Sequence, residues 1–251
     1  MAIKFFILSA PRTGSTLLVR TLNSIDGICC HGELFLPGQV RGLRDDFDPF
    51  AATPEQRKAR AGKLLDARNA DAANFLALAL DRPEPAVGLK IIYEDFLQAR
   101  WQATFSGAIA DPDTRFIHLQ RHNALRRYVS EQVMHAGGAI HSDMGGGKDR
   151  KVRVEISPEA FSARCQQLEQ EARAVQSKIA ARPVLDIYYE DLSDNLPSTI
   201  KNVCDFLQLP KIPRSIEPGL QKVGQDDLSE SVLNYQEMLE NPATRPFALM
   251  D

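Results

Sequence analysis

The feature that most constrains the fold is an apolar run that leads directly into a short polar turn at residues 5–18, FFILSAPRTGSTLL. The apolar half is typical of a buried strand, and a helical pattern begins after the turn. Backbone N–H groups in the first turn of a helix lack an internal partner, and the helix dipole adds partial positive charge there. This strand, turn and helix therefore predict a binding site for phosphate or sulfate.

The turn itself supplies groups suited to an anion. Hydroxyl donors come from Thr13, Ser15 and Thr16, Gly14 allows close approach of the backbone, and Arg12 brings a permanent charge with bidentate geometry. This turn differs from the Walker nucleotide loop, G-x-x-x-x-G-K-[ST], because it has neither the first glycine nor the lysine. The turn therefore indicates a reaction other than ordinary ATP hydrolysis.

Size and composition narrow the class of protein. A chain of 251 residues, 43% hydrophobic and 25% charged, suits a single α/β domain over residues 1–251. The net charge of −3 argues against a general nucleic-acid-binding coat. The four cysteines show no CxxC spacing, which favours reduced thiols in the cytoplasm over disulfides or a metal site. No apolar run is long enough for a transmembrane segment.

Apolar runs alternate with helical patterns along the chain, which predicts a central parallel sheet of about five strands flanked by helices on both faces. The fold class is therefore α/β, with a P-loop-like arrangement. The strands are expected near residues 3–8, 28–30, 87–92, 115–119 and 184–188.

The segments between these strands are expected to be helical or irregular. Residues 37–85 form a predicted insertion, a loop followed by helices from Pro54, and the glycine-bracketed residues 137–151 are predicted to be a mobile loop. Long helices are expected over residues 158–182 and 197–207, and one more over 226–240. Arg126 and Arg127 are expected on a solvated helix face.

A second candidate anion site follows the fourth strand. Arg121 stands just beyond the strand, and Ser130 lies nine residues later, after more than two helical turns. Ligands of open α/β sheets gather beyond the carboxyl ends of strands, so this site is expected to share a crevice with the first. Two anion sites in one crevice suit a nucleoside with phosphates at both ends.

The chain resembles sulfotransferases that use 3′-phosphoadenosine 5′-phosphosulfate (PAPS). Residues 11–16, PRTGST, resemble their 5′-phosphosulfate loop, and Arg121 with Ser130 resembles their 3′-phosphate motif. The segment 31–35, HGELF, is similar to one that carries a proposed glutamate base in the bacterial carbohydrate branch, which includes trehalose and nodulation-factor sulfotransferases. Animal cytosolic members have lysine where Arg12 stands, and their C-terminal arginine-lysine-glycine loop has no obvious counterpart here beyond Lys222.

This resemblance implies that the sulfuryl group moves in line from PAPS to a hydroxyl of a carbohydrate, glycolipid or small metabolite, leaving 3′-phosphoadenosine 5′-phosphate (PAP), without a metal. Arg12 would stabilise the leaving phosphate, and Glu33 would act as general base, with His31 as the rival base. Lys90, inside the third strand, has two interpretations of equal weight: it reaches the donor or acceptor in the site, or it faces an edge of the sheet and extends its charged end to solvent. The acceptor pocket is expected to begin at Phe35.

Two other functions remain open from the sequence. A P-loop nucleotide kinase would need a phosphate-binding lysine and a magnesium carboxylate, and the turn lacks such a lysine. A non-catalytic protein that binds an adenosine nucleotide would need the anion sites but no base.

Overall fold

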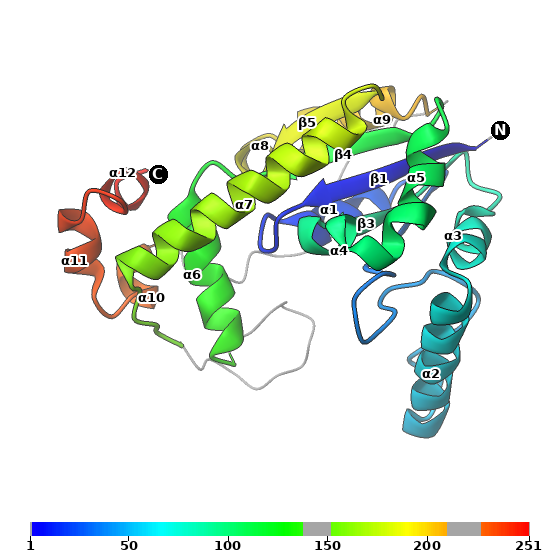
Figure 1. Ribbon diagram of the computed structural model, residues 1–251, viewed down its shortest axis with the longest axis horizontal. Helices are drawn as coiled ribbons and strands as arrows, with labels where there is room; N and C mark the ends of the chain where they lie inside the picture. Colours follow the sequence, from blue (N-terminus) through cyan, green and yellow to red (C-terminus); the bar gives the residue numbers. More distant parts are fainter. Residues whose placement is uncertain (1, 138–151, 210–226, 251) are drawn as a thin grey trace.

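The computed structural model describes residues 2–137, 152–209 and 227–250, and a twisted parallel sheet forms its centre (Figure 1). In chain order the elements are β1 (Ile3–Ser9), α1 (Ser15–Leu22), β2 (Ile28–His31), α2 (Pro54–Ala70), α3 (Ala72–Leu80), β3 (Ala86–Ile92), α4 (Tyr93–Leu97), a 3-10 turn (Ala99–Trp101), α5 (Gln102–Ala110), β4 (Arg115–Gln120), α6 (Ala124–His135), α7 (Pro158–Ile179), β5 (Val184–Tyr188), α8 (Tyr189–Asp194), α9 (Leu196–Phe206), α10 (Leu228–Ser231), α11 (Tyr235–Glu240) and α12 (Arg245–Ala248).

The sheet has the strand order β2-β3-β1-β4-β5, and every neighbouring pair is parallel. Each strand lies within one residue of its predicted bounds at either end. The α/β fold class predicted from alternating strands and helices is therefore confirmed. Because the strands are parallel, their carboxyl ends share one edge of the sheet, where the turn after β1 and the residues after β4 come together.

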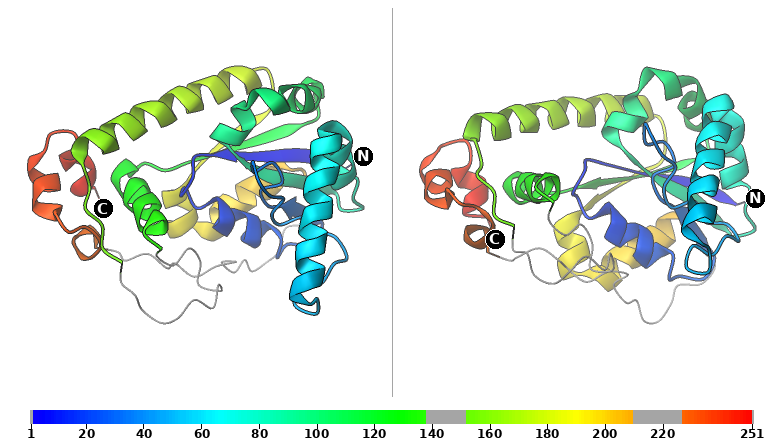
Figure 2. Two further views of the ribbon diagram at one scale, coloured as in Figure 1. Left: turned by 60° about the horizontal axis from the view of Figure 1, so that its bottom comes forward. Right: turned by 90° about the horizontal axis from the view of Figure 1, so that it is seen from below.

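Helices cover both faces of the sheet, as predicted (Figure 2). Phe5 and Ile7 of β1 pack with α1 and α9 on one face. Phe6 and Leu8 face the other way and pack with α3, α4, α5 and α7. Alternate residues of a strand point to opposite faces, so a strand buried on both sides is a continuous apolar run.

A third apolar cluster joins α6 and α7 to the C-terminal helices beyond the end of the sheet. The single helix predicted over residues 226–240 is wrong in this region. The segment divides into α10 and α11, because Val232 adopts an extended conformation and forms a parallel bridge with Val154. The backbone hydrogen bond from Leu233 N to Val154 O, 2.8 Å, holds the break.

The predicted insertion contains α2 and α3, in agreement with the expected helices after Pro54. A capping box at Thr53, with Pro54 at the first helical position, begins α2. Most of α2 is exposed, and it stands beside the body of the molecule (Figure 2). The predicted mobile loop falls almost wholly on residues 138–151, which lie outside the described part of the chain.

Candidate active site

The turn between β1 and α1 has the backbone of an anion cradle. Gly14 precedes α1 with φ 83°, and Arg12 is also in the left-handed region with φ 65°. A Cβ at Gly14 would lie 2.4 Å from Cδ2 of Tyr189, so a side chain there would clash as well as strain the backbone. No side chain caps the start of α1. The first-turn N–H groups thus suit an incoming anion, which agrees with the prediction from the sequence.

The two predicted anion sites lie next to each other. Arg12 Nε donates to Ser130 Oγ at 3.0 Å, across 118 residues of sequence. Arg121 Nη1 donates to the Arg12 carbonyl at 3.3 Å. Arg121 Nε is buried and, within the described residues, has no hydrogen-bond partner. Burial lowers the pKa of both guanidiniums, and a bound anion would offset this cost of desolvation.

Glu33 is connected to this cradle through Lys90. Lys90 Nζ lies 3.2 Å from Glu33 Oε1 and donates to Thr16 Oγ1 at 3.1 Å. Arg41 Nη1 lies 3.7 Å from the other carboxylate oxygen of Glu33. The structure thus brings Lys90 into the site and holds the Glu33 carboxylate between two cations at the edge where the strands end.

Three predicted site residues have buried side chains that make other contacts. Thr13 is buried and its hydroxyl donates to the Ala10 carbonyl at 2.9 Å, so the expected hydroxyl donor points inward. His31 is fully buried, with Nε2 2.7 Å from Ala79 O and Nδ1 accepting from Arg44 N, which contradicts its role as rival base. Phe35 packs against Phe75, Trp101 and Phe105 in the core instead of lining an acceptor pocket. Lys222 lies outside the described residues.

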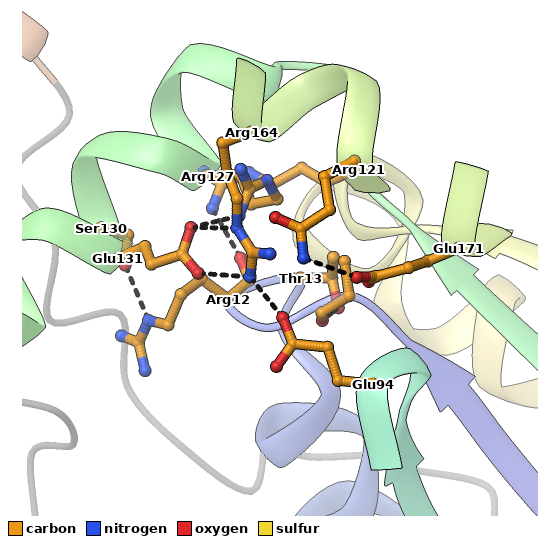
Figure 3. A network of polar contacts seen from close by, with 11 residues as sticks. Arg12, Thr13, Glu94, Arg121, Arg127, Ser130, Glu131, Arg164 and Glu171 are labelled. Carbon is orange, nitrogen blue, oxygen red and sulfur yellow. Dashed lines mark hydrogen bonds and ion pairs between the residues drawn. The ribbon is translucent and has the colours of Figure 1, made fainter. Parts of the chain in front are cut away.

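A cluster of charged side chains borders Arg12 on the side of α6 and α7 (Figure 3). Glu131, next to Ser130, accepts from Arg127 Nη1 and Arg164 Nη2, each at 2.8 Å. Arg164 Nη2 also lies 2.9 Å from Glu94 Oε1. Burial opposes ionisation of Glu131, but the hydrogen bonds from both arginines outweigh it and lower its pKa. The expected solvated position is therefore wrong for Arg127, which is buried in this cluster.

The sequence interpretation left this cluster and two residues after β5 outside the site. Tyr189 lies with its ring 4.3 Å from the Arg121 guanidinium, and Glu190 accepts from the backbone N–H groups of His122 and Asn123. Glu190 comes directly after a strand, at the same edge of the sheet as Arg121, and this position could have identified it as a site residue from the sequence. No local signal joins Glu94, Glu131 and Arg164, because they come from three different helices.

A cleft of about 530 Å³ opens beside the turn after β1. Pro11 and Ile92 contribute apolar walls, and Glu94, Glu131 and Arg164 contribute charged ones. The cleft therefore adjoins the anion cradle and offers both donors and acceptors of hydrogen bonds.

Asp95 carries a pH-dependent contribution to stability next to this site. It is 3% exposed, and burial, followed by the charges of Glu33 and Glu94, raises its pKa to about 7. The folded chain then binds more protons than the unfolded chain between about pH 4 and pH 7, so stability falls as the pH rises through that window. In the unchanged chain this group lowers the unfolding free energy by about 3 kcal/mol between pH 5 and pH 8, and we expect Asp95→Asn to abolish that loss.

Urea unfolding of both proteins at the two pH values measures this difference. Asp26→Asn, at an exposed position, serves as the control and should leave the pH dependence unchanged. Equal pH dependence in Asp95→Asn and the unchanged chain would show that Asp95 titrates normally.

Within the described residues, no helix is both long and apolar enough to cross a bilayer. Over the same ranges, histidine, cysteine and carboxylate side chains form no group of three that could hold a metal ion.

Comparison with known proteins gave one family and several solved structures. No curated protein matches the chain. A sulfotransferase from Alicyclobacillus acidocaldarius is 15% identical over 100% of this chain and 97% of its own, with a TM-score of 0.45. The sulfotransferase domain of the curacin biosynthetic pathway is 19% identical over 99% and 89%, with a TM-score of 0.44.

Mouse sulfotransferase SULT7A1, solved with PAP, is 12% identical with a TM-score of 0.44; the match covers 84% of this chain and 59% of the mouse chain. The family model described as "Sulfotransferase family" matches residues 4–213, which include β1 to α9 and every element of the candidate site. The chain therefore belongs to the sulfotransferase family.

Proposed function

We propose that this protein transfers the sulfuryl group of PAPS to a hydroxyl of a carbohydrate, glycolipid or other small polar metabolite, with Glu33 as general base. The observation that carries the proposal is the connection from Thr16 through Lys90 to Glu33, with contacts of 3.1 and 3.2 Å. It brings a fixed carboxylate to an anion cradle, which a binding module would not need.

The residues present fit a donor with a phosphate group at each end. The first-turn amides of α1, the Arg12 guanidinium and the hydroxyls of Ser15 and Thr16 would hold the phosphosulfate. Ser130 and Arg121 would hold the 3′-phosphate. The buried Nε of Arg121 makes no hydrogen bond among the described residues and lies 4.0 Å from Glu190 Oε1. When bound, the donor supplies an activated sulfuryl group on a phosphate leaving group.

The side chains then perform three tasks. Glu33 accepts the proton of the acceptor hydroxyl as the new O–S bond forms and the S–O bond to the 5′-phosphate breaks. Arg12 and the first-turn amides stabilise the negative charge that grows on the departing phosphate oxygen. Lys90 orients the Glu33 carboxylate, and its other contact, Thr16, lies at the start of the donor site.

The cleft beside Pro11 supports a polar acceptor. Its carboxylates and the Arg164 guanidinium suit an acceptor with several hydroxyls better than a flat apolar phenol. We also place the activity in the cytoplasm, since all four cysteines are unpaired. The alternative, an ATP-dependent kinase, lacks support because the turn holds no phosphate-binding lysine.

A thermal-shift comparison of PAP with magnesium ATP tests this function. PAP at about 100 times its dissociation constant should add about 2.7 kcal/mol to the unfolding free energy, whereas ATP should add much less. Turnover is then measured as PAP released from PAPS with trehalose, N-acetylglucosamine or glycerol as acceptor. Stabilisation by ATP alone would reject the proposed function.

A further inference from the structure

Arg68 is the buried residue of an otherwise exposed helix. Among the seventeen residues of α2, Arg68 alone is buried, and it is 0% exposed. An arginine loses hydration on burial, so an apolar side chain would anchor α2 at lower cost. Its burial therefore calls for an explanation beyond attachment of the helix.

The Arg68 guanidinium lies at the centre of the loop that follows Glu33. Nη1 donates to the carbonyls of Leu34 and Gln39, each at 3.0 Å, and to that of Leu36. Nη2 donates to the Pro37 carbonyl at 3.4 Å. Four backbone carbonyls of one short loop thus converge on one side chain.

The remaining donors of Arg68 are also used. Nε and Nη2 contact Oδ1 of Asn69 at 3.3 and 3.0 Å, and the guanidinium lies 5.0 Å from the centre of the Trp101 ring. Among the described residues, the hydrogen-bond acceptors of Arg68 are neutral oxygens. Its charge is therefore compensated mainly by the carbonyl dipoles of the loop.

The same loop is closed at its base by backbone hydrogen bonds around Glu33. Gly32 N donates to Gly42 O at 2.8 Å, and Arg41 N donates to Glu33 O at 3.0 Å. Leu34 and Phe35 bury their side chains in the core, and the Leu34 carbonyl contacts Arg68 of α2. Without the Arg68 donors, the carbonyls of Leu34, Pro37 and Gln39 would each lose a hydrogen bond, and that of Leu36 would keep the longer one from Gln39 N, 3.4 Å.

We propose that Arg68 is a positioning residue that holds the 34–39 loop and thereby fixes the Glu33 carboxylate beside Lys90. The inference rests on the proposed function, since Glu33 is the base only in that reaction. Arg68 touches neither donor nor acceptor, so its loss should affect the chemical step more than donor binding. A lysine carries the charge but lacks the planar fork that contacts several carbonyls at once.

The test compares Arg68→Lys and Arg68→Ala with Arg57→Lys and Arg57→Ala. Arg57 is a matched control because it lies on the same helix and donates to a backbone carbonyl, that of Pro49 at 2.9 Å, but at an exposed position. Steady-state release of PAP from PAPS is measured with the acceptor that gives the highest turnover, or with water if none does. Added guanidinium chloride, against sodium chloride at equal concentration, tests chemical rescue of Arg68→Ala.

We expect Arg68→Lys to lower kcat by about tenfold or more and Arg68→Ala by about a hundredfold, because small displacements of a reacting group have effects of this size. The KM for PAPS should stay within about twofold of that of the unchanged chain. Guanidinium should restore part of the kcat of Arg68→Ala. Unchanged kcat in Arg68→Lys, a parallel loss of PAPS binding, or absence of rescue would overturn the proposal.

Failure of the proposed function would be separately visible. In that case PAP does not stabilise the unchanged chain. The contribution of Arg68 to the rigidity of the loop is then measured by amide hydrogen exchange of residues 34–39. Exchange should be faster in Arg68→Lys than in Arg57→Lys. Equal exchange in the two variants would reject the structural part of the inference.

Discussion

Glu33→Gln is expected to lower kcat for sulfuryl transfer by about two to four orders of magnitude, the range for loss of a general base. The amide keeps the size of the side chain and its contact with Lys90 but accepts no proton from the acceptor hydroxyl. Binding of PAP should be retained, because the first-turn amides of α1 and Arg12 are unchanged. The measurement is PAP release from PAPS together with the thermal shift caused by PAP.

Glu169→Gln is the matched control for this variant. Glu169 is exposed on α7 and pairs with Arg173 at 3.5 Å, so its amide should leave both measurements unchanged. Retention of turnover in Glu33→Gln, with PAP still stabilising the protein, would remove Glu33 from the mechanism. Loss of the PAP shift as well would indicate that the substitution disturbs the cradle.

Arg12→Ala is expected to lower kcat by about a hundredfold to a thousandfold, as for removal of one well-aimed donor to a developing negative charge. The substitution removes the guanidinium between the cradle and Ser130. It also removes one positive charge near Glu131, whose hydrogen bonds from Arg127 and Arg164 remain. Because Arg12 would contact the donor before and during the reaction, the KM for PAPS should rise as well.

Arg173→Ala tests whether loss of a positive charge alone explains the result. Arg173 is exposed on the same molecule, with 78% of its side chain accessible, and should show normal kcat and KM. Arg12→Lys should recover part of the activity, since it retains the charge but lacks the second N–H group of the fork. Equal kinetics in Arg12→Ala and Arg173→Ala would exclude Arg12 from the reaction.

The parts of the site that could be predicted belong to short, continuous segments. The strand bounds follow from apolar runs, and the cradle follows from a turn whose residues are adjacent in the chain. The proximity of the turn to the segment with Arg121 and Ser130 could also be predicted, because parallel strands place both segments at one edge of the sheet; the direct contact of Arg12 with Ser130 was not predicted. Glu33 follows the same rule, since it lies just beyond the end of β2.

The errors occurred where neighbours in sequence separate in space. His31 and Phe35 lie two residues before and after Glu33, yet both are buried, because β2 ends at His31 and the chain turns at residues 34–35 instead of continuing as an extended strand. Arg127 stands in a polar segment that resembles a solvated helix face, yet its partner Glu131 and the crossing helix α7 bury it. The Thr13 hydroxyl, expected to face an anion, instead donates a hydrogen bond to the Ala10 carbonyl within its own turn.

The sequence by itself therefore determined the α/β class, the strands of the sheet and the cradle before α1, because each depends on periodicity or on chemistry within a few residues. Only the tertiary structure decided that Lys90 bridges Thr16 and Glu33, and that Arg68 lies inside the loop after Glu33. The partners of Lys90 and Arg68 lie 74 and 34 residues away. Which charges meet over such separations depends on how the helices pack on the sheet, since the cost of burying a charge is offset only where its partners are brought to it.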